Sequence, residues 1–132
     1  MGLAGLIAMK PPLLLLDEPS ASLDPASTRR FIHHLRHLNT HHGYTFIIVT
    51  HDMNLAARIA QRIIILDDGK ITADGNARDI LTNQTLLSQS RLEPPILTRM
   101  FQEFLNDPCD HNKIPITMDE AINFLKKRKD TP

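Results

Sequence analysis

The chain has 132 residues, enough for one compact domain with a tail, since domains commonly run from about 50 to 250 residues. Lys and Arg together number 15, as do Asp and Glu, so the formal net charge is zero and the basic excess typical of nucleic-acid-binding proteins is missing. No apolar run approaches the ~20 residues that span a bilayer, and the first nine residues lack the basic start and cleavage site of a secretory signal. The single cysteine, Cys109, excludes an internal disulfide and fits a reducing cytosol.

The first predicted elements are a helix and a buried strand. Residues 2–9 are small and apolar and predict a buried helix that ends before two prolines. The leucines at residues 13–16 predict a strand covered on both faces, as in a doubly wound parallel sheet. The carboxyl ends of such strands open toward the ligand crevice, which makes Asp17 and Glu18 candidate functional residues.

A second helix and a second strand follow. Pro25, directly after Asp24, predicts the start of a helix that runs to about residue 41 and stops at Gly43. Its apolar face comprises Phe31, Leu35 and Leu38. Residues 44–50 predict another continuous apolar strand, at the spacing of a parallel βαβ crossover.

Histidines occupy the opposite face of this helix, at His33, His34, His37 and His41. Spacings of four residues place three of them in a row, which raises the hypothesis of a metal site, with nickel or cobalt as the ions to test. No carboxylate or cysteine lies beside them, and a solvated helix face is the alternative that explains them well.

The rest of the chain predicts a β-hairpin with helices on either side. The expected elements are a helix at 53–61, a strand at 62–66, a tight turn at 67–70, its partner strand at 71–73, and a helix at 76–81 capped by Asn76. From about residue 83 a polar, proline-rich tail begins, with one helix opening at 91–101 whose Ile96, Met100, Phe101 and Phe104 can share a face. A capping box from Thr117 to Glu120 starts the last helix, and its basic end at 126–129 suits the helix dipole better than a lipid-binding patch.

Three motifs, in order and at the right spacing, resemble those of ATP-binding-cassette (ABC) ATPases. Residues 13–19 resemble the Walker B strand, residues 20–25 the D-loop and residues 49–53 the H-loop. The tail segments 92–101 and 115–121 resemble the end of energy-coupling-factor ATPases, including those of cobalt and nickel importers. The resemblance implies an α/β fold, a partial P-loop NTPase domain comprising its carboxyl-terminal half (residues 1–82), and a helical extension (residues 83–132).

The resemblance also implies roles for four residues in the hydrolysis of ATP with Mg²⁺. Asp17 matches the acid that holds Mg²⁺, and Glu18 matches the residue that polarises the attacking water. His51 matches the histidine that senses the γ-phosphate, and Asp24 matches the D-loop acid at the dimer interface. A solvated strand end and an ordinary loop histidine are the alternatives for each residue alone, but their joint spacing favours the family interpretation.

Two motifs of a complete cassette are missing from the sequence. It contains neither the Gly-x-x-x-x-Gly-Lys-Ser/Thr phosphate loop nor the Leu-Ser-Gly-Gly-Gln signature. We therefore expect the chain to be the carboxyl-terminal part of a longer protein, with both motifs encoded upstream, and to be inactive and aggregation-prone alone.

The function that the resemblance implies is that of an ATPase subunit of an importer for a metal ion or vitamin. It would act at the cytoplasmic face of the membrane, as a peripheral protein bound to a second ATPase subunit and a transmembrane coupling subunit, without nucleic acid. The alternatives are a non-catalytic half-domain that serves as an interaction module and a non-transport ABC ATPase.

Overall fold

The computed structural model describes residue 5 and residues 11–105 and 114–129, and the chain divides into two compact units, residues 1–51 and 52–132. The helix predicted at 2–9 lies outside the described residues apart from Gly5, and so does Cys109. The boundary expected after residue 82 rests on the family resemblance and stays a prediction. No helix of the described part is long and apolar enough to cross a membrane.

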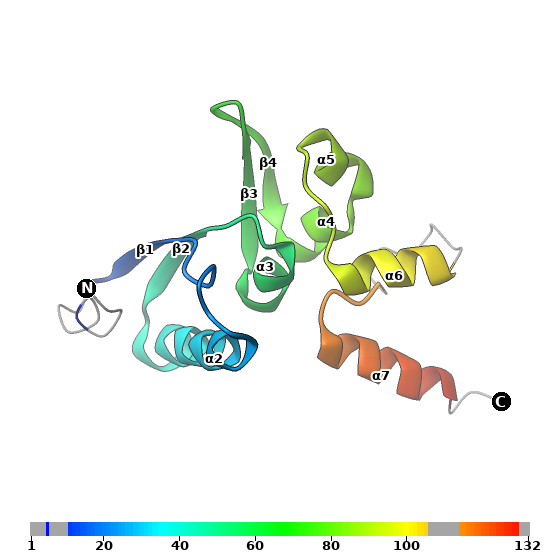
Figure 1. Ribbon diagram of the computed structural model, residues 1–132, viewed down its shortest axis with the longest axis horizontal. Helices are drawn as coiled ribbons and strands as arrows, with labels where there is room; N and C mark the ends of the chain where they lie inside the picture. The colour runs from blue at the N-terminus through cyan, green and yellow to red at the C-terminus, as the bar shows by residue number, and fades with distance from the viewer. Residues whose placement is uncertain (1–4, 6–10, 106–113, 130–132) are drawn as a thin grey trace. The chain divides into compact units, whose positions relative to one another are not determined.

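The first unit contains a parallel strand–helix–strand arrangement (Figure 1). Strand β1 (Leu13–Asp17) pairs with β2 (Thr45–Val49), from Leu13 opposite Thr45 to Asp17 opposite Val49, and α2 (Pro25–His42) is the crossover. The two strands and the helix confirm the predicted elements to within one residue at each end.

Both ends of α2 are stabilised by residues suited to helix termini. Asp24 Oδ1 accepts the backbone N–H groups of Ala26 and Ser27, each at 2.9 Å. At the other end Gly43 adopts a left-handed φ of 70°, and its N–H donates to the carbonyl oxygen of Leu38. These two caps explain why the helix has the length that the sequence predicts.

The sheet of the first unit is buried on one face only. Leu14 and Leu16 are 5% and 9% exposed. The opposite face, here called the outer sheet face, consists of side chains that are 49–66% exposed: Leu13, Leu15, Ile47 and Val49. The prediction that β1 is covered on both faces is therefore wrong for this chain. Within residues 11–51 α2 is the single helix, and one helix can cover only one face of a sheet.

The second unit contains a β-hairpin and helices on either side of it in sequence. Its described elements are α3 (Met53–Ile59), β3 (Arg62–Asp67), β4 (Lys70–Asn76), α4 (Ala77–Thr82), α5 (Gln84–Gln89), α6 (Ile96–Leu105) and α7 (Met118–Lys129). The hairpin turn at Asp68 and Gly69 has φ values of 47° and 74°, the left-handed conformation that favours an Asp-Gly pair. Strand β4 is longer than the predicted 71–73, because its pairing with β3 continues to Asn76 opposite Arg62.

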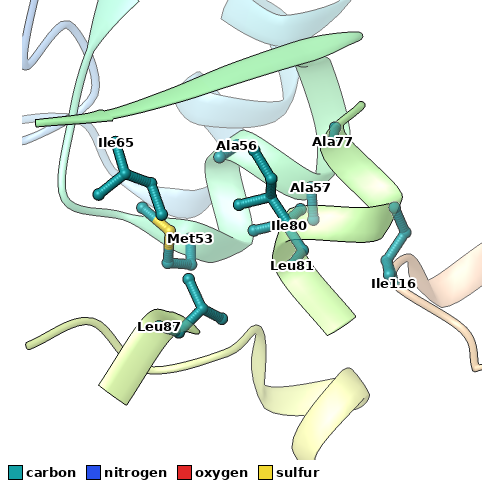
Figure 2. Packing of buried hydrophobic residues seen from close by; sticks show 9 residues of the cluster. All are labelled: Met53, Ala56, Ala57, Ile65, Ala77, Ile80, Leu81, Leu87 and Ile116. Atoms are coloured by element: carbon teal, nitrogen blue, oxygen red, sulfur yellow. The ribbon is translucent and has the colours of Figure 1, made fainter. Parts of the chain in front are cut away.

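A core of apolar side chains joins the hairpin to the helices of this unit (Figure 2). The cluster comprises Met53, Ala56, Ala57, Ile65, Ala77, Ile80, Leu81, Leu87 and Ile116. Leu81 and Leu87 are fully buried. Leu87 belongs to α5, which the sequence analysis missed by assigning residues from 83 to a polar tail. Asn83 caps this helix by accepting the N–H of Leu86 at 3.0 Å.

The expected apolar face of α6 is also wrong. Phe101 is 4% exposed and lies edge-on to Phe124 with ring centroids 5.3 Å apart, but the other three side chains, Ile96, Met100 and Phe104, are 50–79% exposed. The helix starts at Ile96, after two prolines, rather than at 91. Two adjacent stripes of this helix are apolar, and helical spacing alone does not show which of them packs inward.

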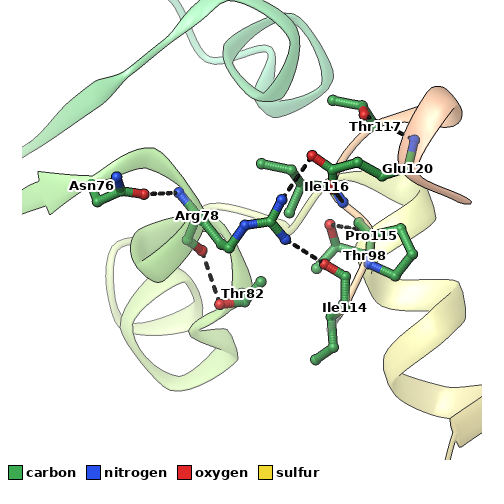
Figure 3. Close-up of polar contacts among 9 residues, drawn as sticks. All are labelled: Asn76, Arg78, Thr82, Thr98, Ile114, Pro115, Ile116, Thr117 and Glu120. Atoms are coloured by element: carbon green, nitrogen blue, oxygen red, sulfur yellow. Dashed lines mark hydrogen bonds and ion pairs between the residues drawn. The ribbon is translucent and has the colours of Figure 1, made fainter. Parts of the chain in front are cut away.

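A polar network connects α4 to the segment before α7 (Figure 3). Arg78 donates to the carbonyl oxygen of Ile114 at 2.8 Å and pairs with Glu120 at 2.7 Å. Glu120 also accepts the N–H of Ile116 at 3.0 Å, and Thr117 Oγ1 accepts the N–H of Glu120 at 3.4 Å. The bond from the Glu120 N–H to the Thr117 hydroxyl confirms one half of the predicted capping box. In the other half the Glu120 carboxylate accepts the N–H of Ile116, one residue before the Thr117 N–H that a capping box uses.

Candidate functional site

Four residues, three of them predicted to be functional, lie at one edge of the parallel sheet. Asp17 and Glu18 stand at the carboxyl end of β1, and Thr50 and His51 follow the last residue of β2. Because the strands are parallel and Asp17 lies opposite Val49, both strand ends reach the same edge. The backbone N–H of Glu18 extends the pairing by donating to the carbonyl oxygen of Val49 at 2.9 Å.

The carboxylate of Glu18 is held from the neighbouring strand by three hydrogen bonds. Its Oε1 lies 3.0 Å from the backbone N of His51 and 2.5 Å from His51 Nδ1, and its Oε2 accepts the hydroxyl of Thr50 at 2.9 Å. Glu18 has a φ of 41°, which is unusual for a residue other than glycine. The three hydrogen bonds offset the energetic cost of this backbone conformation, which directs the carboxylate along the edge of the sheet.

Partial burial raises the pKa of Glu18, but the hydrogen bonds from His51 and Thr50 and the charge of His51 outweigh it, so that this pKa lies below its usual value of 4.5. Glu18 is therefore ionised at neutral pH. An ionised carboxylate only accepts hydrogen bonds, so the proton between Glu18 Oε1 and His51 Nδ1 belongs to His51 Nδ1. The imidazole ring is 83% exposed and its Nε2 side is available to a ligand.

Asp17 provides an exposed carboxylate next to this pair. Within the described part of the chain its side chain makes no hydrogen bond or ion pair, unlike that of Glu18. A free, exposed carboxylate at a strand end fits Mg²⁺, a hard cation that typically takes one or two protein carboxylates together with waters and phosphate oxygens. The exposed carboxylate of Asp17 is thus of a type that fits Mg²⁺.

Asp24 caps α2 in this structure, a role that the resemblance does not mention. Hydrogen bonds from the hydroxyl and backbone N–H of Ser27 outweigh partial burial and lower the pKa of Asp24. Its oxygens accept from Ser27 Oγ at 2.6 Å and from the first N–H groups of α2. Asp24 is thus the cap of α2, and its place at a dimer interface stays a prediction.

The sequence predicts no role for Thr50, although it lies within the segment that resembles the H-loop. Its hydroxyl donates a hydrogen bond to Glu18 Oε2, and His51 bonds to Glu18 Oε1. The two residues together orient the carboxylate. The signal available in the sequence was a hydroxyl residue immediately before His51, directly after a predicted strand.

The histidines of α2 are all exposed, and they include one that the prediction left out, His42. Burial and the charges of its four neighbouring histidines lower the pKa of His37. No group of three or more His, Cys, Asp or Glu side chains within the described ranges is arranged to hold a metal ion. The solvated-face interpretation is consistent with this arrangement.

Comparison with known proteins shows what this fold resembles. The family described as "AAA domain, putative AbiEii toxin, Type IV TA system" matches residues 2–57. Among solved structures, cbiO1 from Clostridium perfringens, part of the ABC transporter complex cbiONQ, matches 77% of this chain and 39% of its own at 26% identity and a TM-score of 0.58. The fold is that of a partial P-loop NTPase domain of the ABC ATPase type.

Curated relatives match most of this chain. The energy-coupling factor transporter ATP-binding protein EcfA1 of Clostridium novyi is 34% identical over 98% of this chain, and EcfA1 of Methanospirillum hungatei is 39% identical over 96%. The chain is homologous to ABC transporter ATP-binding proteins, energy-coupling factor subunits among them. It spans 46% of the length of each of these two relatives.

Proposed function

We propose that this chain supplies the hydrolytic half of an ABC ATPase site that serves an energy-coupling-factor importer. The observation that carries the proposal is the ionised Glu18, fixed by Thr50 and His51 beside the free carboxylate of Asp17. The homology to transporter ATP-binding proteins supports the same class of activity.

The geometry supports a separate task in hydrolysis for each residue. Glu18 Oε2 receives one hydrogen bond from Thr50, so a lone pair remains to accept a proton from an attacking water. The exposed Nε2 side of His51 is free to donate to a phosphate oxygen when the ring is protonated. Asp17 would hold Mg²⁺, whose charge offsets the negative charge that develops on the transferred phosphoryl group.

The proposal extends to partners. A second ATPase subunit would complete the site, with Asp24 near the interface, and a transmembrane coupling subunit would bind the assembly at the cytoplasmic face of the membrane. The phosphate loop would come from the part of the relatives that this chain does not span. Alone, the chain should bind magnesium ATP weakly, because backbone N–H groups and a lysine provide much of the phosphate affinity in P-loop proteins.

A chimera tests the catalytic assignment. The chain would be joined to the amino-terminal part of the C. novyi relative, and ATP hydrolysis would be compared with that of the Glu18→Gln variant. Loss of general base catalysis should lower kcat by about 10²–10⁴ while nucleotide binding persists. Asp17→Asn should instead weaken magnesium-dependent binding, and His51→Ala should lower turnover. Glu103→Gln, the same change at an exposed position on α6, is the matched control. Parent-level turnover by Glu18→Gln would refute the assignment.

The second candidate is a non-catalytic interaction module, and the outer sheet face favours it. Four apolar side chains at 49–66% exposure form a surface that soluble proteins normally cover. Co-purification of the chain with its partner, without ATP hydrolysis by the chimera, would support this second function over the first.

A further inference from the structure

The helix α2 carries five exposed histidines and no acidic residue between Pro25 and His42. Two of them, His37 and His41, are four positions apart, so they occupy the same stripe of the helix. Their rings are stacked, with centroids 4.5 Å apart and an interplanar angle of 26°. No other pair of rings on this helix approaches as closely within the described residues.

The hydrogen bonds around His41 define which of its ring nitrogens carries a proton. Thr40 Oγ1 donates its hydroxyl proton to the carbonyl oxygen of Arg36 at 2.8 Å. The same oxygen lies 2.8 Å from His41 Nδ1, and it has only lone pairs left to offer, so Nδ1–H is the donor. The carbonyl oxygen of His37, 3.3 Å from His41 Nδ1, is a further acceptor. The lone pair of His41 is therefore on Nε2.

This is the arrangement that metal-binding histidines show, with one ring nitrogen donating to an oxygen of the protein and the other nitrogen free to coordinate. Two nitrogens that bind one ion at about 2.1 Å each must come within roughly 3–4 Å of each other. Side chains four residues apart on a helix start from Cβ atoms about 5–6 Å apart, and rotation of the His37 ring can meet that requirement while His41 keeps its bond to Thr40.

We propose that His37 and His41 chelate a divalent transition-metal ion of the borderline class, such as Ni²⁺, Cu²⁺ or Zn²⁺. Imidazole ligands without carboxylates favour these ions over Mg²⁺ and Ca²⁺. Because no third protein ligand stands in the described part of the chain, water completes the coordination. The site is on α2, and its ligands do not include the residues proposed to act on ATP.

The test titrates the full chain with Ni²⁺ alone by calorimetry. His37→Gln and His41→Gln should each weaken binding by about 100-fold, because loss of one ligand removes the chelate. Thr40→Val should weaken it by about 10-fold, since the acceptor that orients His41 is lost, whereas Thr40→Ser keeps the acceptor and should restore the affinity. His33→Gln is the matched control on the same helix and should leave the affinity unchanged.

Electron paramagnetic resonance of the chain loaded with Cu²⁺ alone gives an independent readout, with coupling expected to two nitrogens in the parent and to one in His41→Gln. Circular dichroism establishes that the helix persists in each variant, as expected for exposed positions. Ni²⁺ binding by His41→Gln as tight as that of the parent, or an equal loss in His33→Gln, would overturn the proposal.

Discussion

Replacement of Arg78 by Met should destabilise the second unit through the network that ties α4 to the segment before α7. The guanidinium of Arg78 donates to the carbonyl oxygen of the buried Ile114 at 2.8 Å and pairs with Glu120 at 2.7 Å. Methionine keeps most of the apolar stem, so the change removes mainly the polar contacts.

The expected loss follows from these two contacts. A hydrogen bond from a charged donor to a buried acceptor contributes about 1.5–3 kcal/mol, and a partly exposed ion pair about 0.2–1 kcal/mol. The side chains of Arg78 and Glu120 are 27% and 39% exposed, so the lower part of each range applies. We expect Arg78→Met to lower the free energy of unfolding by about 2 kcal/mol.

Urea unfolding monitored by circular dichroism measures this loss, and hydrogen exchange locates it at the amide groups of α7. Glu120→Gln, which removes the charge alone, should cost about 0.2–1 kcal/mol. Arg62→Met breaks the ion pair with Asp74, whose arginine side chain is 69% exposed, and should have a smaller effect than Arg78→Met. Equal effects of Arg62→Met and Arg78→Met would refute the reasoning.

Three further predictions concern other parts of the chain. Asp52 accepts the N–H groups of Asn54 and Leu55 at 2.9 and 3.0 Å, so Asp52→Ala should cost about 1 kcal/mol in urea unfolding, with Asp52→Asn close to the parent. The pKa of Glu18 is lowered below 4.5, so the hydrogen bonds of its ionised carboxylate stabilise the first unit above that pH. This stabilisation is lost as the pH falls through the pKa of the folded state. The difference in unfolding free energy between the parent and Glu18→Gln should therefore shrink from pH 7 to pH 3. Leu15→Thr with Ile47→Thr should reduce self-association in sedimentation experiments, and a monomeric parent chain would contradict that expectation.

Local chemistry made much of the fold predictable. The cap at Asp24, the Asp-Gly turn at Asp68 and the cap at Asn76 each depend on residues within a few positions, and each is present in the structure. Apolar runs gave both parallel strands because strand length and spacing are encoded locally.

The features that the sequence analysis missed depend on partners that are distant in the sequence. Helix α5 lacks a strong apolar period and is fixed by the burial of Leu87 in the core. The inward side of α6 is chosen by Phe124, more than twenty residues after Phe101. The exposed outer sheet face reflects the absence of covering helices within residues 11–51, which the apolar pattern of β1 does not reveal.

In the candidate site, too, some features could be predicted from the sequence and others depend on residues distant in the chain. The motif spacing predicted that Asp17, Glu18 and His51 belong together, and the structure brings Glu18 and His51 into contact. The hydroxyl of Thr50 and the positive φ of Glu18 were not predicted, because both follow from the pairing register of the two strands.

The parallel pairing of β1 and β2 has a consequence for how the chain folds during translation. Thr50 bonds to Glu18 across 32 positions, whereas the β3–β4 hairpin closes through a local turn and can form within about 1–10 μs. At ~5–20 residues per second, a ribosome needs about 2–6 s to pass from the end of β1 to the end of β2. During that interval β2 is not yet available to pair with β1, so the leucine strand is open to chaperones and to pairing with other chains.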